Sequence, residues 1–77
     1  MVNPSEIQEH MEVKGSDGSH IGTVDHMDGD RIKLTRSDPA SGGEHHYLGL
    51  DLVDEIRGGA VWMTATAEQC QQSWSTV

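Results

Sequence analysis

The chain has 77 residues, 34% of them hydrophobic, and its thirteen acidic and five basic side chains give a formal net charge of -8 at pH 7. A chain this short forms one domain with a small core, and its negative charge repels phosphate backbones and anionic lipid headgroups, which excludes nucleic acid and membrane surfaces as expected partners. The single cysteine, Cys70, rules out an internal disulfide, and no apolar stretch reaches membrane-spanning length, so we expect a cytoplasmic protein.

A short helix is the first predicted element, running from the N-cap Asn3 to about His10. Pro4 suits the first helical position, and Glu6 is placed to complete a capping box. The pattern then changes to period two, which predicts a first strand around Val13, followed by a glycine-rich turn.

The second predicted strand, from about His20 to Met27, has a fault in its alternation. Ile21 and Val24 are both core candidates, but a spacing of three places them on opposite faces of a regular strand. A bulge at Gly22 adds one residue to the register and returns Val24 to the face of Ile21. The sequence therefore predicts a bulged, strongly twisted second strand.

A tight turn at residues 28–30 leads into the most regular strand of the pattern, residues 31–36. Its alternation places Ile32 and Leu34 inward. The segment 37–44 contains proline and a glycine pair, which is typical of a mobile surface loop.

Extended character returns at residues 45–50, followed by one tight helical turn at residues 51–54 and a last strand at residues 60–64. A C-terminal helix is then predicted from its capping residues, with Thr66 as N-cap and Gln69 as its capping-box partner. The apolar stripe of this helix is Ala67, Cys70 and Trp74.

The inward positions of these elements make up the predicted core. They are Met11, Val13, Ile21, Val24, Ile32, Leu34, Leu48, Leu50, Val53, Ile56, Val61 and Met63.

Several segments together carry a family resemblance: residues 13–18, 20–26, 30–39 and 45–51. Through them the chain resembles, from about Glu9 to Trp74, the bacterial family catalogued as domain of unknown function 2171, and more distantly the PRC-barrel superfamily. The resemblance implies a mainly β fold, a small PRC-barrel-like β-barrel of five to six strands with short N- and C-terminal helices. It also implies a docking or assembly module, since PRC-barrel domains elsewhere have such roles, and it implies no catalytic activity.

Histidine is the one residue type whose distribution suggests site chemistry. The candidates are His20, His26, His45 and His46. Imidazole is a ligand for zinc or nickel, but such a site needs three or four ligands that converge. Adjacent residues 45 and 46 point to opposite faces of a strand, so at most one joins a given site. A histidine-based metal or small-ligand site is therefore the alternative hypothesis, and the competing interpretation is hydrogen-bonded histidines on the surface.

Other candidate chemistry is weaker. Asp25, Asp28 and Asp30 surround a turn, but they lack the twelve-residue ligand register of a calcium-binding EF-hand loop. Cys70 lies on an apolar stripe, where a buried structural thiol is expected in place of a nucleophile. A chain this small offers little cleft for a substrate, so the sequence predicts no enzyme and no cofactor.

The strongest functional indication is Trp62, which alternates with the inward residues on its strand and so faces outward. A large exposed ring needs either cover from a terminal helix or a partner. Arg31 and Lys33 give one strand a basic outer face, and Tyr47 occupies the outer face of the strand after the loop. We therefore expect a non-enzymatic module that acts through protein contact or self-association, for example as a homodimer.

Overall fold

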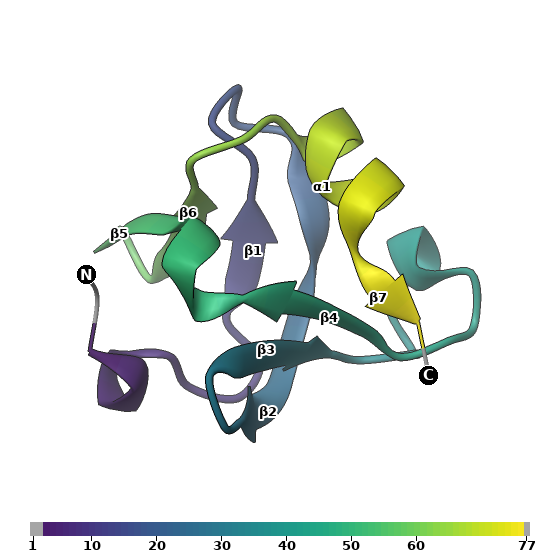
Figure 1. Cartoon of the computed structure of the whole chain (residues 1–77), viewed down its shortest axis with the longest axis horizontal. Coiled ribbons are helices and arrows are strands. Elements are labelled where there is room, and N and C mark those ends of the chain that lie inside the picture. Colours follow the sequence, from purple (N-terminus) through teal and green to yellow (C-terminus); the bar gives the residue numbers. More distant parts are fainter. Residues whose placement is uncertain (1–2, 77) are drawn as a thin grey trace.

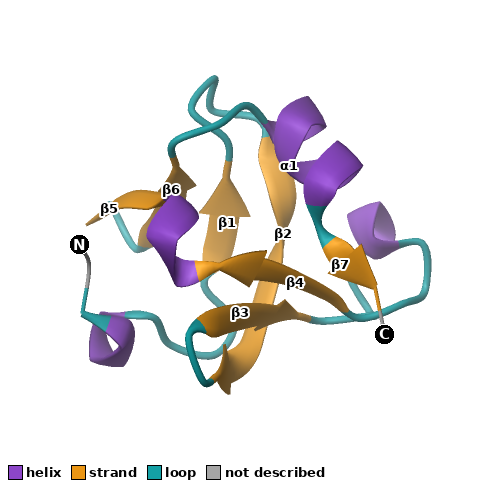
Figure 2. Ribbon diagram, in the orientation of Figure 1, coloured by secondary structure: helices purple, strands orange, loops and turns teal. Residues whose placement is uncertain are grey.

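A seven-stranded mixed sheet, in the order β5-β6-β1-β2-β3-β4-β7, forms most of the computed structural model, which describes residues 3–76 (Figure 1). The strands are β1 Glu12–Lys14, β2 His20–Asp28, β3 Arg31–Leu34, β4 His46–Gly49, β5 Val53–Arg57, β6 Ala60–Met63 and β7 Ser75–Thr76. One α-helix, α1 Ala67–Ser73, and three 3₁₀ turns, η1 Pro4–Glu6, η2 Pro39–Ser41 and η3 Leu50–Leu52, complete the described chain (Figure 2). No helix among residues 3–76 is long and apolar enough to span a bilayer.

The sheet is curled but open. β1 and β6 pair in parallel and the other neighbours are antiparallel, while β5 and β7 lie at opposite ends of the strand order. The predicted closed barrel of five to six strands is therefore wrong, although a mainly β fold is confirmed. Closure requires a hydrogen-bonded ladder between the first and last strands of the order. A last strand of only two residues supplies too few groups for such a ladder.

The predicted bulge beside Gly22 is present. Gly22 and His20 pair with successive residues of β1, so Ile21 is the extra residue, and both Ile21 and Val24 are fully buried. A side chain at residue 22 would crowd Leu34, because an added Cβ would lie 3.2 Å from its Cδ1 atom. A second irregularity in β2, at residue 25, was not predicted. The two bulges bend the nine-residue β2 so that it belongs to both halves of the sheet.

The N-terminal helix is shorter than predicted. Asn3 and Glu6 form the expected capping box, but they cap only the 3₁₀ turn η1, and Ile7 already has extended backbone angles. His10, at the predicted helix end, has a positive φ of 71°. Burial explains the early stop, because the side chain of Ile7 enters the core.

The C-terminal helix α1 matches its prediction. Thr66 and Gln69 form the capping box, and Ala67 and Cys70 are buried. Gly15 allows the first turn of the chain to approach this helix, since a Cβ there would overlap the backbone nitrogen of Ala67.

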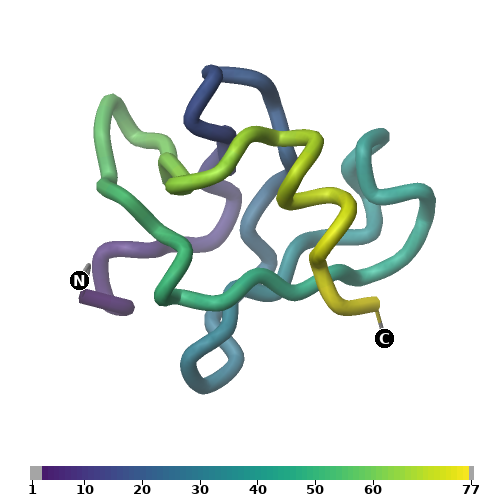
Figure 3. Tube along the Cα trace, turned by 45° about the horizontal axis from the view of Figure 1, so that its top comes forward, coloured from purple at the N-terminus to yellow at the C-terminus, as the bar shows by residue number. Residues whose placement is uncertain are grey.

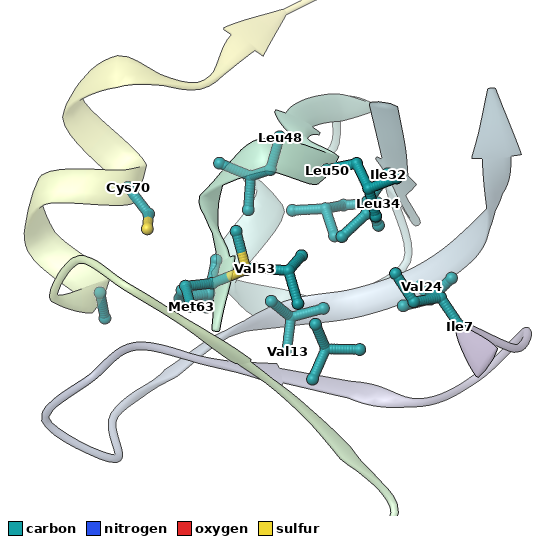
Figure 4. Close-up of a cluster of buried hydrophobic side chains, with 13 residues drawn as sticks. Ile7, Val13, Val24, Ile32, Leu34, Leu48, Leu50, Val53, Met63 and Cys70 are labelled. Atoms are coloured by element: carbon teal, nitrogen blue, oxygen red, sulfur yellow. The ribbon is translucent and has the colours of Figure 1, made fainter. Parts of the chain in front are cut away.

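The core lies inside the curl of the sheet (Figure 4). Ten of the twelve predicted residues are buried, and Met11 and Ile56 pack against the core while remaining half-buried. Ile7 and Ala60 are buried residues that the alternation did not identify. The ends of β2, β3, β4 and β6 differ from the predicted ones by at most two residues, whereas no strand bounds were predicted for β5 and β7. The helical turn predicted at residues 51–54 is η3 at residues 50–52, and residues 53 and 54 already belong to β5.

Candidate contact surface

Trp62 lies on the outer face of β6, between two buried neighbours, and its indole is half-buried. The guanidinium of Arg57 lies 4.2 Å from the ring centroid, and the ammonium of Lys14 lies 5.3 Å from it. The indole Nε1 donates a hydrogen bond of 3.3 Å to the carbonyl oxygen of Arg57. The turn at Gly18 borders the ring, where an added Cβ would be 3.9 Å from it. Cationic side chains therefore partly cover Trp62, whereas α1 packs against β2.

Register explains why these side chains meet. Lys14 of β1 and Glu55 of β5 are the residues paired with Trp62 on its two sides. Arg57 also forms an ion pair with Glu55, with 3.2 Å between Nη1 and Oε1. We call Lys14, Glu55, Arg57 and Trp62 the Trp62 patch. The patch is a half-buried aromatic ring with charges of both signs around it. It lies next to the edge of β5 that pairs with no other strand among residues 3–76, which we call the free edge of β5.

Tyr47 forms a similar but separate arrangement on β4, which we call the Tyr47 patch, with Arg31 and Lys33 of β3. The guanidinium of Arg31 lies 4.3 Å from the ring centroid of Tyr47 and 3.2 Å from the carboxylate of Asp28. Lys33 pairs with Tyr47 across the strands. The strands β1 and β2 separate this patch from β6 and Trp62 in the sheet order. The four residues expected to make one interaction surface thus lie in two patches.

The cationic side chains of this acidic protein are concentrated at these two rings. Of its five lysines and arginines, three lie over the rings and Lys33 pairs with Tyr47, which leaves only Arg36 away from them. Cation–π contacts contribute about 0.5–1 kcal/mol each at exposed positions. These contacts place a cation over the face of each ring.

Three of the four candidate histidines make hydrogen bonds within the fold, and His20 lies between two carboxylates. Its Nδ1 lies 2.9 Å from Oε2 of Glu12, and its Nε2 lies 2.8 Å from Oδ2 of Asp38. Partial burial alone would lower the pKa of His20, but its hydrogen bonds to the Glu12 and Asp38 carboxylates and their negative charges raise it above its ordinary value. Only the doubly protonated ring can donate to both carboxylates, so the charged form is favoured.

Asp38 belongs to the segment 37–44, for which the sequence predicted a mobile surface loop. In the structure, hydrogen bonds from His20 and Thr23 to Asp38 connect this segment to β2. The side chain of Asp38 is 5% exposed and accepts hydrogen bonds from Thr23 Oγ1 at 2.7 Å and from the backbone N–H of Ala40 at 2.8 Å. Burial would raise the pKa of Asp38, but these donors and the charge of His20 lower it. Asp38 also caps η2, so one carboxylate joins the loop to β2. The backbone of this loop can be followed in Figure 3.

The buried His46 holds the other side of this loop. Its Nε2 lies 2.6 Å from the carbonyl oxygen of Ser41, and its Nδ1 lies 3.0 Å from Thr76 Oγ1. Its ring stacks on Trp74 with centroids 3.8 Å apart. Both ring nitrogens are therefore engaged in structural contacts between the loop and the C-terminal segment.

The two remaining candidate ligands, His26 and His45, lie near the bulge at Asp25. His26 Nδ1 is 3.6 Å from Oδ1 of Asp25, and His45 Nδ1 is 3.9 Å from Oδ2 while contacting the carbonyl oxygen of Leu34 at 3.0 Å. Within residues 3–76 no three or more histidine, cysteine or acidic side chains are placed to hold a metal ion. The four candidate ligands are thus distributed over three separate contacts.

The described part of the chain also forms no pocket. Cys70 is buried, and that burial raises the pKa of its thiol, with a smaller contribution from the charge of Asp17. A thiol in this state is a poor nucleophile. The two aromatic patches on the outside of the curled sheet are the candidate contact surfaces.

These observations define a small β-rich domain with structural histidines and aromatic outer-face patches. The chain belongs to the DUF2171 family, described as an uncharacterized protein conserved in bacteria, whose sequence profile matches residues 7–71. The matched region contains β1 to β6 and most of α1. No curated protein and no solved structure matches the chain.

Proposed function

We propose that the protein is a non-enzymatic protein-contact module, and that the Trp62 patch is its contact surface. One observation carries the proposal: a half-buried tryptophan is held on the outer face between Arg57 and Lys14, beside an end strand of the sheet. Tryptophan and arginine are, with tyrosine, the residue types most enriched among those that dominate binding energy at protein interfaces.

The preorganised state of the patch also supports this function. Ordering a long cationic side chain at an interface costs free energy, and a side chain already held by an ion pair and a ring loses less freedom on binding. Arg57 has both restraints in the free protein. Residues 3–76 form no pocket, and a surface without one suits a protein partner better than a small molecule.

A more distant relationship to the PRC-barrel superfamily is part of the proposal. The turn and bulged strand at residues 15–24 are similar to the signature of that superfamily, whose domains serve elsewhere in docking and assembly. We propose the cytoplasm as the location, because a single buried thiol suits a reducing compartment. No observation favours the metal-binding alternative.

Site-specific photo-crosslinking in the bacterial cytoplasm tests the proposal. A photoreactive residue at Lys14 samples the Trp62 patch, and one at Lys33 is the matched control, because both lysines are half-buried on an outer face. We expect a discrete protein adduct from position 14 and a weaker one or none from position 33.

The adduct partner, once purified, provides the quantitative test. Trp62→Ala should weaken its binding by about 2 kcal/mol, or roughly thirtyfold, whereas Tyr47→Ala should change it by less than about threefold. Absence of a discrete adduct from position 14, or equal effects of the two substitutions, would refute the proposed function.

A further inference from the structure

The free edge of β5 has a defined set of hydrogen-bonding groups. Gly58 and Gly59, both with positive φ, form a two-residue loop between β5 and β6, and Arg57 pairs with Ala60 at its base. In such a hairpin the residues that flank the loop are the hydrogen-bonded pair, and the next residue presents its N–H and C=O to the other side. Ile56 therefore presents its backbone groups to the free edge.

Regular pairing at this edge is confined to residues 55–57. On one side Asp54 is an extra residue in the ladder with β6, and on the other side the glycine loop begins. A bulge and charged side chains on an end strand are devices that prevent indiscriminate strand pairing. The edge therefore accepts only a short strand whose charges match its own.

We propose that this edge pairs with β5 of a second copy of the chain, antiparallel and about a two-fold axis at Ile56. The inference rests on the proposed function, because it assigns a partner to an edge that includes Glu55 and Arg57 of the Trp62 patch. A two-fold axis perpendicular to the sheet preserves the face of each residue. Centring it on Ile56 uses the free backbone groups, and Ile56 of each copy exchanges two hydrogen bonds with the other.

The charges of β5 fit this register. With Ile56 opposite itself, Glu55 lies opposite Arg57 of the second copy, and symmetry forms this pair twice. Such flanking pairs are the close, non-hydrogen-bonded type, with Cα atoms about 4.5 Å apart, where opposite charges attract most effectively. Glu55 and Arg57 already form an ion pair within one chain, so both project from the same face. A two-fold axis at Glu55 would instead place Glu55 opposite Glu55 of the second copy, so two like charges would meet. It would also require the backbone N–H and C=O of Glu55, which are already paired with β6.

The half-buried Ile56 adds a smaller apolar contribution. Its side chain packs against the core at the end of the sheet, so pairing would continue the core across the two-fold axis. The contact is small, and the net charge of -8 on each copy opposes association. We therefore expect a weak dimer whose population rises with protein concentration.

Charge exchange tests this register directly. Glu55→Arg produces a chain with two arginines at the edge, and Arg57→Glu produces one with two glutamates. Each variant alone should dimerise about tenfold more weakly than the wild type in sedimentation equilibrium up to about 1 mM, because both symmetric pairs become repulsive. An equimolar mixture should recover mixed dimers to within about threefold of wild-type affinity, seen by native mass spectrometry with one chain isotope-labelled.

Any one of three results overturns the inference. They are a wild-type chain that stays monomeric, single variants that dimerise as tightly as the wild type, and a mixture that dimerises no more tightly than either variant alone. If a variant does not fold, amide hydrogen exchange of the wild type decides instead. The Ile56 N–H should exchange more slowly as concentration rises, and an unchanged rate refutes the pairing. An adduct at position 14 with a different protein would leave the proposed function standing while removing this inference.

Discussion

Replacing Asp38 with alanine should lower the free energy of unfolding by about 3 kcal/mol. The carboxylate is 5% exposed and accepts three hydrogen bonds, from Thr23 Oγ1 at 2.7 Å, His20 Nε2 at 2.8 Å and the Ala40 N–H at 2.8 Å. Losing the bond from Thr23 costs about 1 kcal/mol, and losing an N-cap costs about 1 kcal/mol. The contact with His20 contributes up to about 1 kcal/mol, because a ring that is 40% exposed is well screened by water.

Urea unfolding at pH 7, followed by far-ultraviolet circular dichroism, measures this loss. The matched control is Asp28→Ala, since Asp28 is exposed and has one ion pair, with Arg31 at 3.2 Å. The control should cost less than about 1 kcal/mol. If Asp38→Ala cost no more than Asp28→Ala, the carboxylate would not hold the loop in the way described here.

Three further outcomes follow from the structure. The pKa of His20 is raised in the folded state, so its stabilising contribution is complete below about pH 6.5 and is lost as pH rises through the folded pKa. The difference in unfolding free energy between the wild type and His20→Gln should therefore become smaller from about pH 6 to pH 9. A difference that grows with pH would contradict the contacts with Glu12 and Asp38. Gly15→Ala should destabilise the fold by about 1–3 kcal/mol in thermal unfolding, because the methyl group would overlap the backbone nitrogen of Ala67; an unchanged midpoint would argue against that close approach. Cys70 should react with a thiol reagent at pH 8 only after unfolding, and rapid labelling of the native protein would show that the thiol is not buried.

The strand pattern could be predicted well because it is a local property. Alternation between buried and outward positions identified Ile32 and Leu34 on β3 and Val61 and Met63 on β6. Even the irregular β2 was predictable at Gly22, because two core residues at a spacing of three require an extra residue between them. The capping residues of α1 were equally local signals.

Long-range pairing could not be predicted in this way. β7 is too short to show a period, and its pairing with β4 depends on Trp74 and His46, which stack although they lie far apart in the sequence. The alternation pattern shows how many strands there are but not whether the two ends of the sheet meet. The prediction of a closed barrel was wrong for this reason. The N-terminal helix failed for a related reason, because tertiary burial of Ile7 overrides the helical start signal.

The outward orientation of Trp62 was predictable, but its surroundings were not. Lys14 and Glu55 reach the ring through β1 and β5, and neither neighbour can be read from the order of strands in the chain. One missed signal was available in the loop: Asp38 before Pro39 is the expected combination of N-cap and first helical residue, and it predicts the turn η2.

The parallel pairing of β1 with β6 has a consequence for the order of folding. Glu12 pairs with Ala60, 48 positions later in the chain (60 - 12 = 48), whereas the hairpin of β2 and β3 closes over a short turn. The entropy of closing such a long loop makes distant pairing late and slow. We expect the β2-β3-β4 meander to assemble first. β1 would then pair only with β2 until β6 pairs with its other edge, which would be the last strand pairing to form.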